Sequence, residues 1–286
     1  MIRIDSHQHF WEYDAEEFSW IDDEMRAIRR SFNPPDLEPY LAVESIRGSV
    51  AVQARQTEEE NEYLLGLHDA HTSVLGIVGW VDLQSESCRE DLEFWSHRRG
   101  FAGVRHIMQG EPDPEFMARP AFRAGIAALA EFDLSYDILI YAHQIGQAVG
   151  LAQAFPNQRF VLDHLAKPPL KSGELEAWRT GIAELSQCEN VCAKVSGLAF
   201  EADWGHWNTD TLRPVVDHAL DCFGAGRLML GSDWPVCLPA GSYARIWDSL
   251  EECFATLSDE EKAGVFGRNA IDFYKLKIES GDNPPD

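Results

Sequence analysis

Short hydrophobic runs rich in β-branched residues recur along the whole chain, and longer amphipathic segments separate them. Each run is continuously apolar instead of alternating with polar residues, which is typical of parallel strands buried on both faces of a sheet. There are eight such runs, and they span residues 2–6, 48–54, 74–81, 102–106, 136–142, 159–163, 190–196 and 227–232.

The segments between the runs have helical periodicity, and they span residues 58–71, 87–99, 120–132, 147–155, 174–188, 211–223 and 243–257. Thr57 with Glu60, and Ser258 with Glu261, fit the capping box that marks the start of a helix. Eight strands that alternate with helices predict an α/β fold, a closed (β/α)₈ TIM barrel. No shift of composition marks a linker, so we expect residues 1–276 to form a single domain.

The balance of charge narrows the possible partners. Lysine and arginine total 24, aspartate and glutamate total 48, and the formal net charge is −24. Because such a chain repels phosphates, we expect neither nucleic acid nor a membrane surface as a partner, whereas a homo-oligomer is possible.

The chain also carries features that bear on its compartment. Its apolar runs are far shorter than the ~20 residues that a membrane-spanning helix needs. Asp5 interrupts the first apolar stretch, so the N-terminus does not resemble a signal peptide. We therefore expect a cytoplasmic protein whose six cysteines, which include no CxxC pair, are reduced and mostly buried thiols.

Two stretches depart from the repeated pattern. Residues 277–286 (KIESGDNPPD) carry one apolar residue and end on two prolines and an aspartate, so we expect a disordered C-terminal tail. The segment of residues 11–36 is longer than an ordinary strand-to-helix loop and contains Trp11, Trp20 and Phe32. We interpret it as a candidate lid over the first strand.

Polar side chains capable of chemistry lie at the carboxyl ends of the predicted strands. The active site of a (β/α)₈ barrel forms at these ends, so we expect the side chains to converge there. In chain order they are His7 and His9, Gln53 and Arg55, Trp80 and Asp82, Arg105 and His106, His143 and Gln144, Asp163 and His164, Lys194 and Ser196, and Asp233.

The first and sixth strands contribute imidazoles. His7 and His9 are two residues apart in a strand, so both side chains point to the same side and could bind one ion or one substrate atom. A pair of hydrogen-bonded histidines without a ligand is the alternative. Asp163 and His164 follow an apolar strand, where the alternative roles are a loop cap and a hydrogen-bonded core histidine.

The last and fourth strands contribute a carboxylate and cationic donors. Gly231 and Pro235 flank the segment that holds Asp233 at the mouth of the barrel, where it could accept a proton from water or ligate a metal. A capping aspartate is the alternative. Arg105 and His106 could donate hydrogen bonds to a substrate carbonyl, or Arg105 could form a structural ion pair. The phosphate-binding, HExxH and GxSxG motifs are absent from the sequence.

Five motifs in this order resemble those of the amidohydrolase superfamily, in particular its sugar-lactonase branch, which includes L-fuconolactonase and L-rhamnonolactonase. The similarity extends over essentially the whole chain. The motifs are residues 5–11 (DSHQHFW), 103–106 (GVRH), 162–168 (LDHLAKP), 194–198 (KVSGL) and 231–235 (GSDWP).

The resemblance implies hydrolysis of an aldonolactone to its sugar acid. It places the superfamily's site residues on His7, His9, His164 and Asp233. Members bind one or two divalent ions, and this branch includes members that use one ion or none. Two-metal members supply a bridging lysine at the end of the fourth strand, where this chain has Arg105 and His106. We therefore expect at most one ion, Zn²⁺ at His7, His9 and Asp233, in an enzyme that works either with this ion or without it.

The mechanism that follows assigns a role to each group. Zn²⁺, or Arg105 together with the imidazoles, polarises the lactone carbonyl. Asp233 is the general base for the attacking water, and His164 stabilises the oxyanion or relays a proton. The residues expected to contact the sugar are Arg105, His106, Gln53, Asp163, Trp80 and Trp204.

Two other functions remain as alternatives. A metal-dependent decarboxylase of a small unsaturated acid would use the same strand ends, with Arg55 and Arg105 to bind a carboxylate. A non-catalytic barrel that binds a sugar acid would have no need for a general base beside three imidazoles.

Overall fold

The computed structural model describes residues 1–278, and its centre is one sheet of eight parallel strands in the order of the sequence. All eight predicted strands are confirmed within a few residues, and the TIM-barrel prediction is correct. The strands are β1 (Ile4–Gln8), β2 (Gly48–Val52), β3 (Val74–Gly79), β4 (Phe101–Ile107), β5 (Ser135–Leu139), β6 (Phe160–Leu162), β7 (Val191–Val195) and β8 (Leu228–Leu230).

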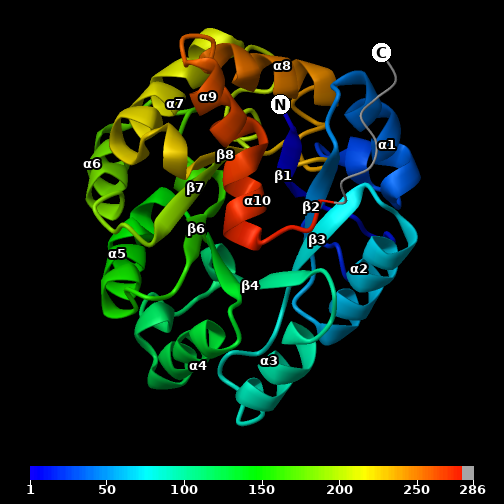
Figure 1. The fold of residues 1–286 in the computed structure, drawn as a ribbon. Helices are drawn as coiled ribbons and strands as arrows, with labels where there is room; N and C mark the ends of the chain where they lie inside the picture. The colour runs from blue at the N-terminus through cyan, green and yellow to red at the C-terminus, as the bar shows by residue number, and fades with distance from the viewer. Residues whose placement is uncertain (279–286) are drawn as a thin grey trace.

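Each strand leads into a helix, and these helices surround the sheet (Figure 1). The seven helices predicted from the sequence are confirmed as α2–α8. For α9 only the start at Ser258 was predicted, and α1 and α10 were not predicted. The helices are α1 (Pro34–Val43), α2 (Glu58–Ala70), α3 (Cys88–Ser96), α4 (Pro120–Glu131), α5 (Ile145–Ala154), α6 (Glu176–Leu185), α7 (Thr209–Phe223), α8 (Tyr243–Cys253), α9 (Asp259–Ala263) and α10 (Asn269–Tyr274).

Both predicted helix starts are present, but only one has the full capping box. Ser258 accepts a hydrogen bond from the backbone of Glu261, whose carboxylate accepts one from the backbone of Ser258. Thr57 likewise caps α2 through the backbone of Glu60. The carboxylate of Glu60 instead turns away to Arg55, whose Nε donates to it at 2.7 Å.

The barrel closes between β1 and the segment that follows β8. Asp233 N donates to the carbonyl of His7 at 2.8 Å, and His9 N donates to that of Trp234 at 2.7 Å. Below this seam, the buried carboxylate of Asp5 accepts hydrogen bonds from Ser232 N at 2.9 Å and Ser232 Oγ at 2.6 Å. These bonds fix Asp233 beside His7 of β1 and beside His9, which follows β1.

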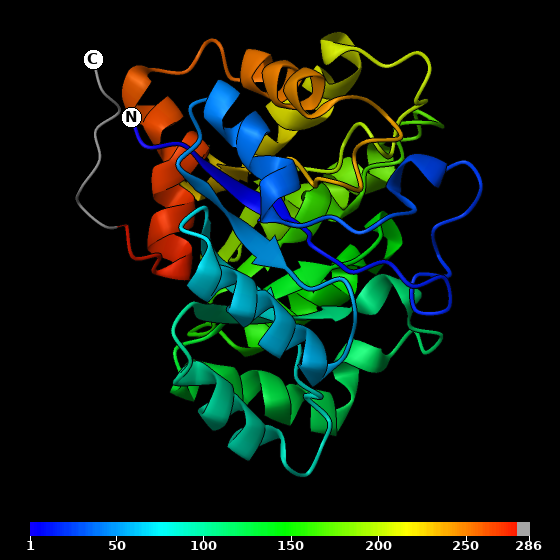
Figure 2. The same ribbon diagram turned by 90° about the vertical axis from the view of Figure 1, so that its right-hand side faces the viewer.

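Helix α10 closes one end of the barrel. Its Phe273 and Tyr274 pack in a small core with Ile4, Val50 and Met229 from the strands. Figure 2 shows α10 at one end of the molecule and the long segment between β1 and α1 at the other. Since α10 covers the amino ends of the strands, the carboxyl ends face the opposite side.

The predictions about segments and thiols have mixed outcomes. In the predicted lid, Trp11 and Phe32 are buried and form an antiparallel bridge, and Trp20 is 43% exposed. All six cysteines are free, four of them buried. The predicted disordered tail lies largely outside the described residues. No helix between residues 1 and 278 is long and apolar enough to cross a membrane.

Candidate active site

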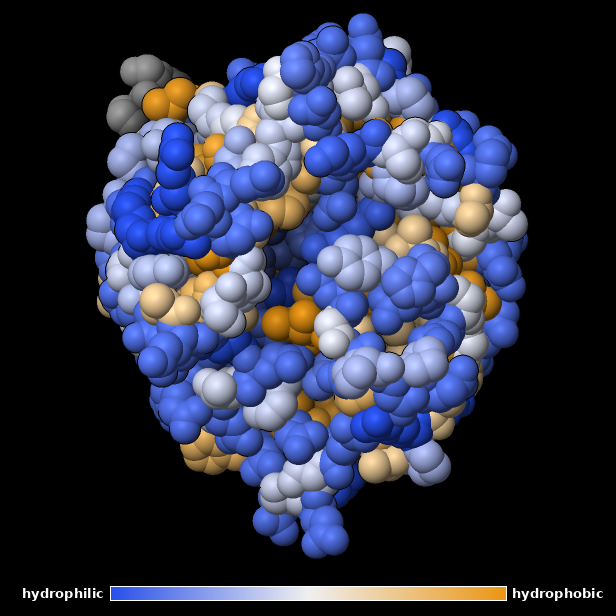
Figure 3. Space-filling view, turned by 180° about the vertical axis from the view of Figure 1, so that it is seen from behind, coloured by the Kyte–Doolittle hydropathy of each residue, from blue (hydrophilic) through white to orange (hydrophobic). Residues whose placement is uncertain are grey.

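A cavity of about 410 Å³ opens at the carboxyl ends of the strands. Figure 3, which looks at the face opposite α10, shows the surface hollowed at its centre. One part of the wall is polar and comprises His9, Arg105, Gln109, Tyr141, His164, Lys167, Glu201 and Asp233. Another part is apolar and includes Trp11, Trp20, Met25, Ile107, Leu139, Phe200 and Val236.

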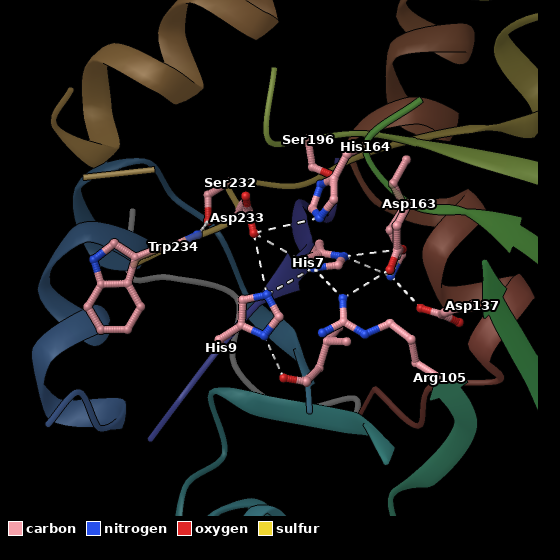
Figure 4. Close-up of polar contacts among 12 residues, drawn as sticks. His7, His9, Arg105, Asp137, Asp163, His164, Ser196, Ser232, Asp233 and Trp234 are labelled. Atoms are coloured by element: carbon pink, nitrogen blue, oxygen red, sulfur yellow. Dashed lines mark hydrogen bonds and ion pairs between the residues drawn. The ribbon is translucent and has the colours of Figure 1, made fainter. Parts of the chain in front are cut away.

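The carboxylate of Asp233 lies among three imidazoles at the base of this cavity (Figure 4). Its Oδ1 is 3.4 Å from His9 Nε2, 3.8 Å from His7 Nε2 and 3.9 Å from His164 Nε2. Burial disfavours the charge of Asp233, but the imidazoles, that of His164 foremost, hold the pKa of its carboxyl below its usual range. Asp233 is therefore ionised at neutral pH, although its buried Oδ1 has no hydrogen-bond partner in residues 1–278.

Hydrogen bonds on the far side of two rings turn their Nε2 atoms towards Asp233. His9 Nδ1 donates to the carbonyl of Val52 at 2.7 Å, so Nε2 is the ring nitrogen left to face Asp233. His164 Nδ1 is 2.9 Å from Ser196 Oγ. Burial lowers the pKa of His164 to about 4, so this ring is neutral at pH 7.

A buried network of charges supports His7 from below. Lys194 Nζ donates to Asp137 Oδ2 at 2.6 Å and lies 3.0 Å from both Asp163 Oδ1 and His7 Nδ1. Arg105 Nη1 donates to Asp163 Oδ2 at 3.1 Å. Burial and the charge of Lys194 hold the pKa of His7 well below its usual range, so this ring too is neutral.

The carboxylates of this network differ in their titration. Burial opposes ionisation of Asp163, but Lys194 and His7 hold its pKa well below its usual range. Burial raises the pKa of Asp137 to about 6, although Lys194 partly offsets the effect. Asp137 also accepts a hydrogen bond from Tyr274 Oη at 2.7 Å, which connects the closed end of the barrel to the site.

The donor atoms around Asp233 suit one divalent ion. His9 Nε2 is 3.4 Å from Asp233 Oδ1 and 3.2 Å from His7 Nε2. Tetrahedral Zn²⁺ with ligands at about 2.1 Å places them roughly 3.4 Å apart, close to these separations. Atoms of His7, His164 and Asp233 also lie within 4.8 Å of one another, so either His9 or His164 can complete the set.

The predicted site residues divide into three groups. His9, Arg105, His164 and Asp233 line the cavity, whereas His7, Gln53 and Asp163 are fully buried behind it. Trp80, His106 and Trp204 lie outside its lining. His106 Nε2 is instead 2.6 Å from Glu111 Oε1, and Trp204 lines a neighbouring groove. His143 is exposed and stacks on Tyr141. Direct contact with a substrate in this cavity is therefore not expected for Trp80, His106 or Trp204.

Arg105 has both of the roles that the sequence left open. It lines the cavity and also forms the ion pair with Asp163. Its Nη2 donates to the carbonyl of Gln53, and Gln53 Nε2 donates to the carbonyl of Arg105 at 3.1 Å. Gln53 is thus a support for Arg105.

The sequence-based site omitted several cavity residues. Lys167 and Glu201 belong to loops, and their charged atoms are 3.8 Å apart. Lys167 was part of the motif of residues 162–168 (LDHLAKP) but had no assigned role, and Glu201 belonged to no motif. Asp137, which is fully buried and does not line the cavity, was also missed because it lies within an apolar strand, although a carboxylate in such a run signals a buried partner.

A (β/α)₈ barrel with histidines after β1 and β6 and an aspartate after β8 defines a class of metal-binding hydrolases. The sequence profile of the amidohydrolase family matches residues 4–276, and this chain belongs to that family.

Individual relatives are similar over nearly their full length. The chain is 37% identical to an L-fucono-1,5-lactonase of Burkholderia ambifaria, over 98% of both chains. It is 36% identical to an L-fucono-1,5-lactonase of Burkholderia multivorans, over 96% of both. A crystal structure of a Burkholderia multivorans amidohydrolase with bound zinc superimposes with a TM-score of 0.94 at 35% identity, and the match covers 97% of this chain and all of that one.

Proposed function

We propose that this protein hydrolyses a sugar lactone to the open sugar acid, with a 6-deoxy-aldono-1,5-lactone such as L-fucono-1,5-lactone as its preferred class of substrate. One observation carries the proposal: an ionised, buried carboxylate lies among three imidazoles at the base of a cavity, in a chain whose curated relatives are L-fucono-1,5-lactonases.

The shape and lining of the cavity support this class of substrate. A volume of about 410 Å³ is ample for one sugar ring. The wall of Trp11, Met25 and Val236 offers an apolar surface for the methyl group that replaces the terminal hydroxymethyl of a 6-deoxy sugar. The polar wall faces the ring hydroxyls.

The reaction that we propose uses Asp233 as general base. A water molecule beside Asp233 loses a proton to the carboxylate as its oxygen attacks the lactone carbonyl. The resulting oxyanion gains from the positive charge of Arg105, which its bonds to Asp163 and Gln53 hold at the cavity. His164, through the Nε2 that faces Asp233, relays the proton to the leaving ring oxygen.

A divalent ion held by His7, Asp233 and either His9 or His164 would add Lewis-acid polarisation of the carbonyl. The chain's own part in binding it is to fix the imidazoles. His7 Nδ1 has Asp163 Oδ1 at 3.3 Å, and when it donates there the Nε2 lone pair is free.

We also infer that the protein works in the cytoplasm. The support comes from its six free cysteines, because thiols persist in a reducing compartment.

The proposal is tested with a panel of L- and D-aldono-1,5-lactones in a pH-indicator assay. We expect L-fucono-1,5-lactone to be among the fastest substrates. For Asp233→Asn we expect kcat to fall by about 10²–10⁴-fold while the fold is kept, because the general base is lost.

A matched control is Asp203→Asn, an exposed carboxylate in another loop, which should leave kcat unchanged. Absence of turnover on every lactone, or an Asp233→Asn enzyme with wild-type kcat, would overturn the proposal.

A further inference from the structure

The loop after β6 has an unusual backbone that brings a second charged side chain into the cavity. His164, Leu165, Ala166 and Lys167 are four consecutive residues in the left-handed region, with φ from 50° to 57°. Since none is glycine, each is strained, and strain of this kind collects where a function requires the conformation. The turn presents both His164 and Lys167 to the cavity, three residues apart.

The ammonium group of Lys167 lies in the cavity opposite one carboxylate. Its Nζ is 3.8 Å from Glu201 Oε1, and the two side chains are only 15% and 21% exposed. Burial lowers the pKa of Lys167 and raises that of Glu201. Both groups therefore lose hydration without gaining a close ion pair, which is costly unless another molecule completes their hydrogen bonds.

One oxygen atom beside the pair can contact both charged groups at the same time. An oxygen about 2.8 Å from each charged atom fits a separation of 3.8 Å. It must accept a hydrogen bond from the ammonium and donate one to the carboxylate. A hydroxyl does both, whereas a carbonyl or ether oxygen cannot donate.

We propose that Lys167 and Glu201 form a hydroxyl-binding subsite, where one ring hydroxyl of the substrate accepts a hydrogen bond from Lys167 and donates one to Glu201. The inference rests on the lactone hydrolysis proposed above and adds the residues that recognise the hydroxyl pattern. Because Lys167 shares its strained turn with His164, the turn fixes the spacing between the bound hydroxyl and the reacting carbonyl.

The test compares L-fucono-1,5-lactone with its 2-, 3- and 4-deoxy analogues in the wild type, Lys167→Met and Glu201→Gln. Analogues are assayed as substrates, or as competitive inhibitors where turnover is too slow. In the wild type, the kcat/KM of one analogue should be roughly 10- to 100-fold lower than that of the parent lactone, or its Ki higher by the same factor. This is the effect expected for a hydrogen bond to a charged group. In both variants, kcat/KM for the parent lactone should fall by a similar factor, mainly because KM rises. The difference in kcat/KM between the parent lactone and that analogue should then shrink to less than about threefold.

Two controls separate recognition from damage to the fold. Lys171→Met removes an exposed lysine of the same loop and should leave all four kinetic profiles unchanged. Thermal melting and the affinity for L-fuconate, the open acid, are measured on every variant. The acid should bind more weakly to Lys167→Met even though no reaction occurs.

The outcomes distinguish this inference from the proposed function. Wild-type enzyme that hydrolyses no sugar lactone overturns the proposed function and this inference with it. Active wild type with variants that slow the parent and all three analogues by one common factor overturns the subsite alone. Selective loss of discrimination at one hydroxyl supports it.

Discussion

The carboxylate of Asp233 is held in an arrangement that favours a bound cation. Its residue has a left-handed backbone, with φ of 59°, and its Oδ1 accepts no hydrogen bond in the described part of the chain. His9 Nε2 lies 3.4 Å from it. A buried carboxylate oxygen without a hydrogen bond, surrounded by imidazole nitrogens, favours binding of a cation.

A melting experiment with zinc tests this arrangement. At a Zn²⁺ concentration about 100-fold above Kd, we expect the Tm of the wild type to rise by roughly 5 °C or more relative to enzyme in chelator. His7→Asn should abolish the rise. His143→Asn, at an exposed histidine, should keep it.

The same experiment identifies the third ligand, since loss of the rise in His9→Asn or in His164→Asn tells which imidazole completes the set. An unchanged rise in His7→Asn would place the ion elsewhere.

The buried imidazole of His164 makes stability depend on pH. Burial lowers its pKa to about 4, whereas the pKa in the unfolded chain is about 6.5. Between these values the unfolded chain binds a proton that the folded chain does not. His164 therefore costs stability as pH falls from about 6.5 to 4, by up to roughly 3 kcal/mol.

Urea denaturation of the wild type and His164→Gln at several pH values in chelator checks this effect. Asp5 and Asp137, whose pKa values burial raises to about 6, act with the opposite sign but are common to both proteins. The advantage of the wild type over His164→Gln should thus shrink from pH 7 to pH 4.5. If the free energies of unfolding of the two proteins changed in parallel with pH, the effect assigned to His164 would be contradicted.

The turn after β6 has a strained, left-handed backbone, and the burial of its side chains offsets that strain. Ala166 has φ of 57° and is fully buried. Glycine relieves this strain, worth about 1–2 kcal/mol, but removes a buried methyl group worth about 0.8 kcal/mol. Ala166→Gly should therefore leave the free energy of unfolding within about 1 kcal/mol of the wild type or raise it.

Ala128→Gly is the matched comparison, because Ala128 is buried in the regular helix α4. There glycine loses the methyl group and also the helix propensity of alanine, about 1 kcal/mol. Urea denaturation should show Ala128→Gly less stable than Ala166→Gly by roughly 2 kcal/mol. Equal losses would mean that the turn is not strained.

Elements with a clear period could be predicted from the sequence. Buried parallel strands and amphipathic helices each leave a hydrophobic pattern, which revealed all eight strands and helices α2–α8. Helix α1 was assigned in part to a lid because Pro34, Pro35 and Pro39 disguise it. The turn of residues 164–167 leaves no pattern at all, since Leu165, Ala166 and Lys167 have no preference for positive φ.

The site residues at the ends of strands could be predicted from the sequence, whereas those brought together by contacts between loops could not. The ends of β1, β4, β6 and the segment after β8 indicated His9, Arg105, His164 and Asp233, which line one cavity. The pairing of Glu201 with a lysine depends on how two loops fold over the barrel mouth. An exposed residue near a strand end, such as His143, could not be distinguished in the sequence from those that line the cavity, because the last residues of a strand can point to either face.

For the whole molecule, the excess of acidic residues is the dominant electrostatic feature. The net charge is −24, and 48 acidic side chains face only 24 lysines and arginines, so at most half of them can have a basic partner of their own. Many ion pairs of the described residues are exposed, such as Arg89 with Glu131, and contribute little. Repulsion among the remaining carboxylates should therefore outweigh these attractions.

Salt should consequently stabilise the protein. Raising NaCl from 20 mM to 0.5 M shortens the screening length from about 20 Å to about 4 Å, which suppresses repulsion between distant carboxylates. We expect a gain on the order of 1 kcal/mol, or about 3 °C in Tm, at pH 7.5 in chelator. Choline chloride should give the same gain, because screening does not depend on the identity of the cation. A Tm that falls with salt would mean that the surface ion pairs, and not the unpaired carboxylates, dominate the electrostatic free energy of the fold.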